Sequence, residues 1–199
     1  VWGSGGVAWN SLGLAIATGV TTTILGLIFA LLAVRTRFPG KKWLRALTVL
    51  PIITPPFVIG LALILIFGRA GLVTGLLDQW FGIEPSRYIF GFWGIFIAQV
   101  LAFTPIAFLV VVGVVEGINA SVEEAAQTLG ASRWKTFATI TLPLMRPGLA
   151  NAFLLGFIES LADFGNPIVL GGSFDVLSTE IYFAVAGAQG DIARAAGLA

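Results

Sequence analysis

The sequence predicts an all-α fold, a polytopic transmembrane helical bundle with about five spanning helices. Its composition supports this prediction, because 57% of the 199 residues are hydrophobic and only 11% are charged, whereas soluble domains contain about 25% charged residues. Its hydrophobic pattern supports it too, since a spanning helix needs about 20 mostly apolar residues. The runs that reach this length cover residues 12–34, 46–67, 89–115 and 147–170.

The first run, 12–34, contains no charged residue. It includes the small residues Gly13, Ala17 and Gly26, and small side chains let neighbouring membrane helices approach closely. We therefore expect this segment to span the membrane and to make close contacts with another helix.

The second and third runs, 46–67 and 89–115, are also free of charge. Pro51, Pro55 and Pro56 lie in the second run, and proline kinks a helix because it lacks a backbone N–H donor. Membrane helices tolerate such kinks where neighbours satisfy the freed carbonyl groups. We expect both runs to be spanning helices, the second with a kink.

The fourth run, 147–170, contains Glu159 and Asp163, which are four residues apart and would share one helix face. A carboxylate at the bilayer centre costs about 2.5 kcal/mol or more, and such groups usually face a bundle interior or a water-filled route. Asn166 precedes Pro167, a step that is expected to end the helix. Glu159, Asp163 and Asn166 are therefore candidates for a polar translocation route. The alternative is that the acids brace the bundle by bonding to another helix.

The two ends of the chain indicate a fragment of a longer membrane protein. Residues 1–10 show no signal-peptide pattern, and a new apolar segment begins near Asp191, close to the last residue. We expect one partial transmembrane domain over residues 1–199, with a fifth span that begins near Asp191.

Positive charge indicates which side of the bundle faces the cytoplasm. The loop 35–45 contains five Lys or Arg residues and no acid, and the polar segment 116–146 adds three more Lys or Arg residues. With four helices that alternate in direction, both loops fall on the same side. That side is predicted to be cytoplasmic.

Missing residue types exclude several classes of function. The chain has no histidine and no cysteine, which excludes thiolate catalysis, disulfides and the usual zinc sites. It has no G-x-x-x-x-G-K-[ST] phosphate loop, so we expect no ATP hydrolysis by this chain alone. Its net charge of +1 gives no electrostatic basis for binding nucleic acid. We therefore expect no enzyme activity, no cofactor and no metal site.

The polar segment is predicted to fold as two helices joined by a turn. Ser121 and Glu124 match a capping box, Gly130 suits a helix C-cap, and Ser132 suits the next N-cap. Pro143 is expected to end the second helix. The first helix has a small apolar face, which would let the backbone of another protein approach closely. This face consists of Val122, Ala125, Ala126 and Leu129.

The spacing of this segment resembles that of the cytoplasmic loop in bacterial ABC importer permeases. The shared pattern is E-A-A, three residues, G, nine residues and I-x-L-P, which stands here at 124–126, 130 and 140–143. In that family the loop supplies a coupling helix that fits a cleft in the ATPase subunit. The resemblance implies contacts with the ATPase by Glu123, Glu124, Ala125, Ala126, Gly130, Ile140, Leu142 and Pro143.

The resemblance extends over nearly the whole chain and implies the fold of a type I ABC importer permease. Segments 160–167, 170–172 and 179–182 are most similar to permeases of the ferric-iron group. The implied protein is a multi-pass permease subunit, or half of a fused permease, in the bacterial inner membrane. Its implied partners are the lipid bilayer, a second permease half or subunit, an extracytoplasmic substrate-binding protein, and cytoplasmic ATPase subunits that hydrolyse ATP.

Two alternatives remain open at this point. An ABC permease for another solute, such as phosphonate, a polyamine, thiamine or sulfate, would have the same loop, although acidic lining residues favour a cation over an oxyanion. An ion-coupled secondary transporter could use Glu159 and Asp163 as a proton or sodium relay. Such a carrier would not need the long polar segment on the cytoplasmic side.

Overall fold

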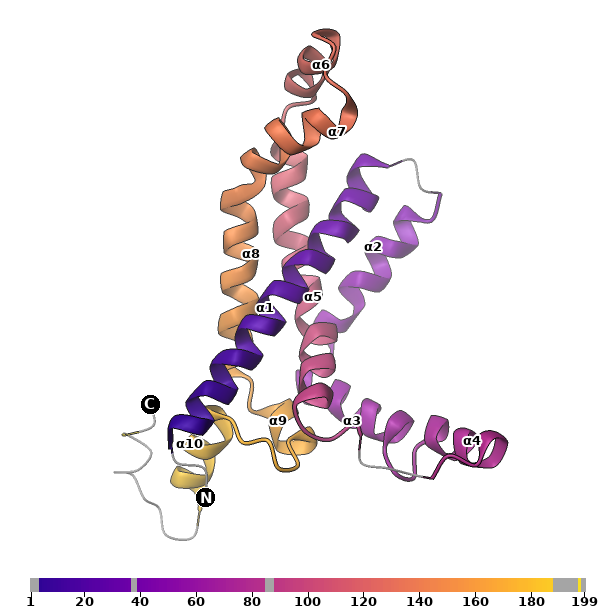
Figure 1. The fold of residues 1–199 in the computed structure, drawn as a ribbon, viewed down its shortest axis with the longest axis vertical. Coiled ribbons are helices and arrows are strands. Elements are labelled where there is room, and N and C mark those ends of the chain that lie inside the picture. Colours follow the sequence, from indigo (N-terminus) through magenta and orange to yellow (C-terminus); the bar gives the residue numbers. More distant parts are fainter. Residues whose placement is uncertain (1–3, 37–38, 85–87, 188–196, 198–199) are drawn as a thin grey trace.

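The computed structural model describes residues 4–36, 39–84, 88–187 and 197, and within these ranges the chain forms helices and loops without a strand. Three long helices lie side by side and form the body of the molecule (Figure 1): α1 (Ser4–Arg35), α5 (Phe92–Gly117) and α8 (Leu142–Ala162). The predicted all-α bundle is confirmed. The shorter elements are α2 (Lys41–Val49), η1 (Leu50–Ile53), α3 (Pro56–Phe67), α4 (Leu72–Phe81), α6 (Ala120–Thr128), α7 (Arg133–Thr136), η2 (Phe137–Thr141), α9 (Gly165–Leu170) and α10 (Leu177–Ala186).

Within the described residues, four helical stretches are long and apolar enough to cross a membrane. They are Gly6–Arg35, Pro56–Phe81, Phe92–Gly117 and Arg133–Ala162. The predicted fifth span begins near Asp191, which lies outside the described residues. Large apolar side chains remain exposed on the outside of the bundle, as expected where lipid rather than water is the neighbour. On α1 they recur every four residues, as Leu12, Ile16, Val20, Ile24, Ile28 and Leu32.

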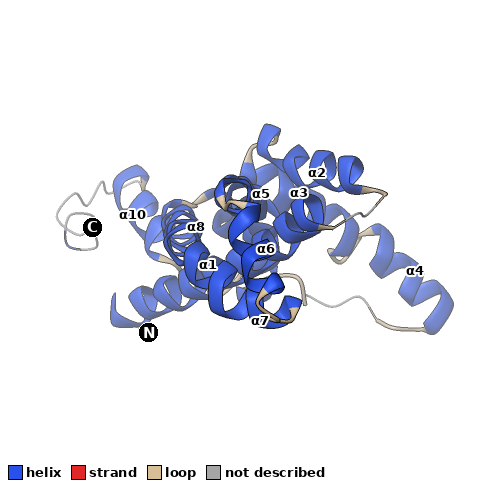
Figure 2. Ribbon diagram, turned by 90° about the horizontal axis from the view of Figure 1, so that it is seen from above, coloured by secondary structure: helices blue, strands red, loops and turns tan. Residues whose placement is uncertain are grey.

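The second run, 46–67, does not form one kinked helix, so this prediction is wrong. The chain forms α2, η1 and α3 in succession, and Thr54 and Pro55 between them are extended, with ψ angles of 132° and 135°. Each of these two residues precedes a proline, and a proline ring disfavours the helical conformation for the residue before it. The candidate span moves to α3 and α4, which lie across one end of the bundle and project to one side (Figures 1 and 2).

The fourth run begins earlier than predicted. The elements α7, η2 and α8 form one continuous helical stretch from Arg133 to Ala162. Pro143, which was expected to end a helix, instead lies at the start of α8. The preceding segment η2 is π-helical, and the N–H of Leu142 donates to the carbonyl of Phe137, five residues back. This wider turn relieves the clash that a proline ring makes with the carbonyl four residues before it.

The fourth run is also interrupted sooner than predicted. Helix α8 stops at Ala162, and Asp163 after it is extended, with ψ of 114°. Asn166 and Pro167 do not end a helix but lie in the first turn of α9. A proline is tolerated there because the first N–H groups of a helix have no partner within it. The spanning helix therefore ends one turn before the predicted step.

Both basic loops lie at the same end of the bundle, as predicted, and we call it the basic end. It contains the loop from α1 to α2 and the polar segment with α6 and α7, whereas α4, α9 and α10 lie at the opposite end (Figure 1). Two ion pairs connect the loops there: Arg35 to Glu123 at 2.7 Å and Arg45 to Glu116 at 2.9 Å. The shared end is thus fixed by direct contacts between the two loops.

Two apolar clusters fill the interior of the bundle. One lies toward the basic end and includes Phe108 and Met145, and the other lies toward the opposite end and includes Ile95 and Leu170. These four side chains are fully buried. The long helices are therefore packed against each other along most of their length.

The close helix contact expected from small residues occurs at one glycine of α1 but not at another. At Gly26, an added Cβ would lie 2.9 Å from the backbone of Ala107 on α5. At Gly13, an added Cβ would meet nothing within 4 Å. Gly26 therefore lies at a close contact between α1 and α5, and Gly13 does not face a neighbouring helix.

Candidate functional site

The polar segment begins with a helix that is capped by a different residue from the predicted one. Asn119 is the N-cap of α6, and its Oδ1 accepts a hydrogen bond from the N–H of Ser121 at 3.1 Å. The predicted capping box of Ser121 and Glu124 is not formed, because both residues lie inside the helix. Asn and Ser are about equally favourable N-caps, so the sequence pattern alone did not distinguish them. Glu124 therefore has no capping role.

The turn after α6 has the geometry predicted for Gly130. Its φ is +87°, in the left-handed region that glycine adopts without steric cost. The N–H of Ala131 donates to the carbonyl of Ala126, and that of Gly130 donates to the carbonyl of Gln127, both at 3.0 Å. These two bonds define a Schellman C-cap. Ser132 then caps α7 as predicted, since its Oγ accepts a backbone N–H of the next turn at 3.2 Å.

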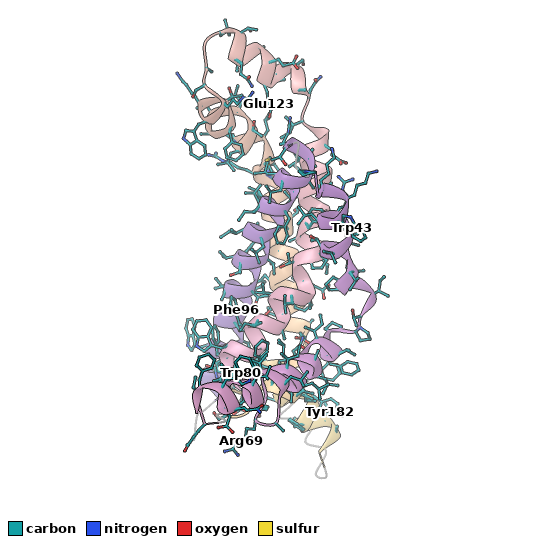
Figure 3. The ribbon with its side chains drawn as sticks, turned by 90° about the vertical axis from the view of Figure 1, so that its right-hand side faces the viewer. Trp43, Arg69, Trp80, Phe96, Glu123 and Tyr182 are labelled. Atoms are coloured by element: carbon teal, nitrogen blue, oxygen red, sulfur yellow. The ribbon has the colours of Figure 1, made fainter. Side chains whose placement is uncertain are left out.

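The two adjacent glutamates of α6 have different surroundings. Glu123 accepts hydrogen bonds from Arg35 Nη1 and from Thr141 Oγ1, both at 2.7 Å, so it lies where α6 meets the long helices (Figure 3). Glu124 is exposed. Together with Gln127 it lines an open hollow of about 1000 Å³ between α6, α7 and the end of α1. Glu123 lines the same hollow, so the two glutamates differ in that Glu123 is bonded to the bundle and Glu124 is exposed.

The apolar face predicted for α6 is not packed against the bundle. Val122 is 44% exposed and Leu129 is 89% exposed, and Ala125 between them is also exposed, while Ala126 is half-buried. In α7, Trp134 is 74% exposed. Exposed apolar side chains that gather on a polar end of a protein indicate a surface that contacts another molecule.

The second half of the spacing pattern lies apart from this exposed tip. Ile140, Leu142 and Pro143 are all half-buried and belong to the junction of η2 with α8. The pattern residues therefore form two groups. Helix α6 and the Gly130 turn make an exposed tip, and the I-x-L-P residues make the stem that joins it to the bundle.

At the other end of α8, the structure brings Asp163 and Asn166 together but separates them from Glu159. The carboxylate of Asp163 accepts hydrogen bonds from Asn166 Nδ2 at 2.8 Å and from the Asn166 N–H at 3.2 Å. Asp163 lies just beyond the last residue of α8, so the predicted helix face shared with Glu159 is wrong. Glu159 is exposed on the surface of α8, whereas Asp163 is half-buried. The two acids do not form one polar site.

A buried glutamine that the sequence analysis missed connects Asp163 to the bundle. Gln99 of α5 is fully buried, and its Nε2 donates to Asp163 Oδ2 at 3.0 Å and to the carbonyl of Ser160 at 3.3 Å. Its Oε1 accepts from Ser160 Oγ at 2.6 Å and from Thr18 Oγ1 at 3.1 Å. One amide therefore joins α1, α5 and α8. The available signal was that Gln99 is the one side-chain amide in the uncharged run 89–115.

Asn166 has a buried oxygen without a hydrogen-bond partner among the described residues. Its Oδ1 faces Gly60 of α3, where an added Cβ would lie 2.9 Å from that oxygen. The absence of a side chain at Gly60 is what allows α3 and α9 to pack together at this position.

Comparison with known proteins identifies relatives over nearly the whole chain. The model of the family described as "Binding-protein-dependent transport system inner membrane component" matches residues 22–197. The ferric transport system permease protein FbpB of Actinobacillus pleuropneumoniae is 52% identical over 193 residues, which are 95% of this chain and 28% of that protein. The molybdenum transport system permease protein ModB of Escherichia coli (strain K12) is 40% identical over 143 residues, 72% of this chain and 61% of that protein.

A solved structure has the same fold. A chain in the crystal structure of a bacterial alginate ABC transporter, in complex with an alginate pentasaccharide-bound periplasmic protein, matches with a TM-score of 0.76 and 23% identity. The match covers 96% of this chain and 71% of that chain. The two curated relatives are longer than the region they share with this chain, which spans less than two thirds of either one.

Proposed function

The chain belongs to the family of binding-protein-dependent transport system inner membrane components, and we propose that it forms the coupling end and part of the translocation route of an ATP-driven importer. The proposed permease lies in the bacterial inner membrane and pairs with a second permease half or subunit. Cytoplasmic ATPase subunits hydrolyse ATP, and an extracytoplasmic binding protein delivers the substrate. This chain has a transport role and no catalytic one.

The exposed face of α6 is the observation that supports this proposal most directly. Its side chains follow the spacing of a face that inserts into a groove, with Val122, Ala125 and Leu129 three and four residues apart. The middle side chain is a small one, so a partner's backbone can approach α6 closely there. Glu124 is exposed on the same helix and supplies a charge for pairing with a basic residue of the partner.

Ferric iron is the proposed substrate of the whole importer. The ferric permease FbpB matches more of this chain, and at higher identity, than the molybdenum permease ModB. The half-buried carboxylate of Asp163 favours a cation at the opposite end over an oxyanion. The competing substrates are molybdate, sulfate, phosphonate, a polyamine and thiamine, and ATP-dependent uptake of any one of them in place of ferric iron would exclude the ferric assignment.

The proposed route passes the junction of α8 and α9. Glu159 is exposed there, Asp163 is half-buried, and Asn166 is buried beside it. Asn166 acts by holding the carboxylate of Asp163 through two hydrogen bonds. In the complete importer, Asp163→Asn should lower uptake while insertion and ATPase docking persist, and Glu159→Gln should have the smaller effect because Glu159 has the more open surroundings.

The experiment that tests the docking proposal uses the full-length permease, co-expressed with its ATPase and purified as a complex. Ala125→Trp adds bulk at the centre of the exposed face and should abolish co-purification of the ATPase. Ala138→Trp is the matched control, since Ala138 is also small and exposed in the polar segment but lies outside the spacing pattern. Normal ATPase stoichiometry with Ala125→Trp would refute docking on α6.

Substrate identity is tested with the same complex in proteoliposomes. Radioactive ferric iron presented by the purified binding protein should be accumulated in an ATP-dependent manner, and molybdate and sulfate should not. Accumulation of another solute instead would refute the ferric assignment but leave the docking proposal intact.

A further inference from the structure

The carboxylate of Glu123 connects α6 directly to the end of α1 and the base of α8, and through Arg35 to α5. Its Oε2 accepts from Arg35 Nη1 at the end of α1, and its Oε1 accepts from Thr141 Oγ1 at the base of α8, both at 2.7 Å. Arg35 also donates, through Nη2, to the carbonyl of Val115 near the end of α5 at 3.4 Å. One carboxylate and one guanidinium therefore link α6 to α1, α5 and α8.

This arrangement differs from an ordinary surface ion pair. The side chains of Arg35 and Glu123 are 27% and 17% exposed, and Thr141 is 3% exposed, so these bonds are partly sheltered although all three residues line the open hollow beside α6. The pair Arg45–Glu116 at the same end has one contact, at 2.9 Å, and its side chains are about half exposed. Sheltered bonds to charged groups are stronger than exposed ones, which contribute little.

Few other contacts hold α6 to the bundle. None of its residues is fully buried, and its main packing partners are α7 and η2 rather than the long helices. Each residue turns a helix by about 100°, so Glu123 and Ala125 lie about 200° apart around α6. Glu123 and Ala125 thus lie on opposite sides of one short helix.

We propose that Glu123 is a positioning residue which makes α6 move as one body with the ends of α1, α5 and α8. On this inference, which rests on the proposed docking of an ATPase to α6, the ATPase contacts the exposed side and displaces α6. Glu123 then transmits the displacement through Arg35 and Thr141 to the ends of α1, α5 and α8. Glu123 therefore does not contact the ATPase, although the family resemblance implied that it is one of the contacting residues.

The position of Thr141 supports this assignment. It is the last residue of the π-helical segment η2, and π-helical turns are locally wider and frequent at functional sites. Along the chain, α6 is joined to α8 only by way of the Gly130 turn, α7 and η2. The bond from Thr141 to Glu123 bypasses this segment by tying α6 directly to the base of α8.

The test measures ATP hydrolysed per substrate molecule imported, with the complete importer in proteoliposomes. Glu123→Gln, Arg35→Met and Thr141→Val each remove one side of the linkage. With Glu123→Gln and Arg35→Met, the ATPase should co-purify normally and hydrolyse ATP, but several-fold more ATP should be used per imported molecule, because the movement of α6 is no longer passed on to the long helices. Thr141→Val should also raise the amount of ATP hydrolysed per imported molecule.

Two matched variants separate this role from others. Glu116→Gln removes the exposed pair at the same end and should leave the ratio unchanged. The double variant Arg35→Met with Glu123→Gln should be no worse than either single variant, because both remove one interaction. An unchanged ratio in Glu123→Gln, or additive effects in the double variant, would overturn the inference.

Loss of the ATPase from the Glu123→Gln complex would also overturn it, since Glu123 would then be a docking residue. If instead the ATPase co-purified normally with the Ala125→Trp variant, the proposed docking on α6 would be refuted. Failure of the docking proposal and failure of the linkage inference therefore give different results. If a variant folds poorly, cysteines placed by Arg35→Cys and Glu123→Cys can be joined by a short bifunctional thiol reagent. Coupling should return on cross-linking, and no return would refute the linkage.

Discussion

The buried amide of Gln99 offers the most quantitative test of how the bundle is held together. Gln99→Met keeps the length of the side chain and removes its polar atoms. Four hydrogen bonds are lost, to Thr18, to the hydroxyl and carbonyl of Ser160, and to Asp163. Interhelical hydrogen bonds in membrane proteins average about 0.6 kcal/mol each, so the expected loss of stability is about 2.4 kcal/mol.

The estimate is this small because the partners can find other bonds. The freed hydroxyls of Thr18 and Ser160 can donate to carbonyls of the preceding helical turn, and Asp163 keeps its bonds from Asn166. For a chain of this length, about 2.4 kcal/mol corresponds to a decrease of about 5–10 °C in the midpoint of thermal unfolding. The assay is thermal unfolding of the purified complex in detergent at a fixed scan rate.

Thr104→Val is the matched control for Gln99→Met. Thr104 is also buried on α5, but its hydroxyl bonds only within the helix, to the carbonyl of Val100 at 2.6 Å. The control should therefore shift the midpoint by much less. If both variants shift it equally, the amide does not tie the helices together, and the argument from burial and hydrogen-bond geometry fails.

Three further outcomes are expected. Gly26→Leu should lower the unfolding midpoint, because the new side chain would meet the backbone of α5. Gly13→Leu should leave the midpoint unchanged, because the space around Gly13 is open. Equal midpoints for the two variants would contradict the close contact between α1 and α5 at Gly26. Gly130→Ala should weaken ATPase co-purification, because a left-handed φ of +87° costs other residues about 1–2 kcal/mol, and Gly130→Asn should lose less. The Ser132→Cys variant should react with an impermeant thiol reagent only in inverted vesicles and the Asp78→Cys variant only from the outside, and the reverse pattern would invert the assigned orientation.

Local sequence signals predicted the turns of the polar segment well. Gly130 adopts the left-handed conformation and Ser132 caps the next helix, because each feature depends on one residue and its immediate neighbours. The error at the start of α6 has the same origin. Asn119 and Ser121 are both competent caps, and the choice between them shifts the helix start by two residues.

Errors in the spanning helices came from treating an uncharged run as one helix. Hydropathy reports which segments are apolar but not where their backbone turns. The residues before Pro55 and Pro56 are extended, as expected because a proline disfavours the helical conformation for the residue before it. The sequence analysis gave more weight to the length of the apolar run than to this effect. At Pro143 the opposite error occurred, because a helix end was predicted and the helix continues. A π-helical turn before Pro143 accommodates the proline, and the sequence spacing gives no sign of that turn.

The roles of Glu123 and Glu124 show what the sequence could not decide. The two residues are identical and adjacent, and although the spacing pattern includes only Glu124, the pattern does not show what either side chain contacts. Their difference comes from Arg35, which lies 88 positions away in the chain and bonds to Glu123, and from the helix start at Asn119, which sets the direction of each side chain. A motif therefore identifies a segment that contacts a partner, while tertiary contacts decide which of its residues face the partner and which face the protein itself. For this chain, that distinction separates the binding of an ATPase from the transmission of its movement.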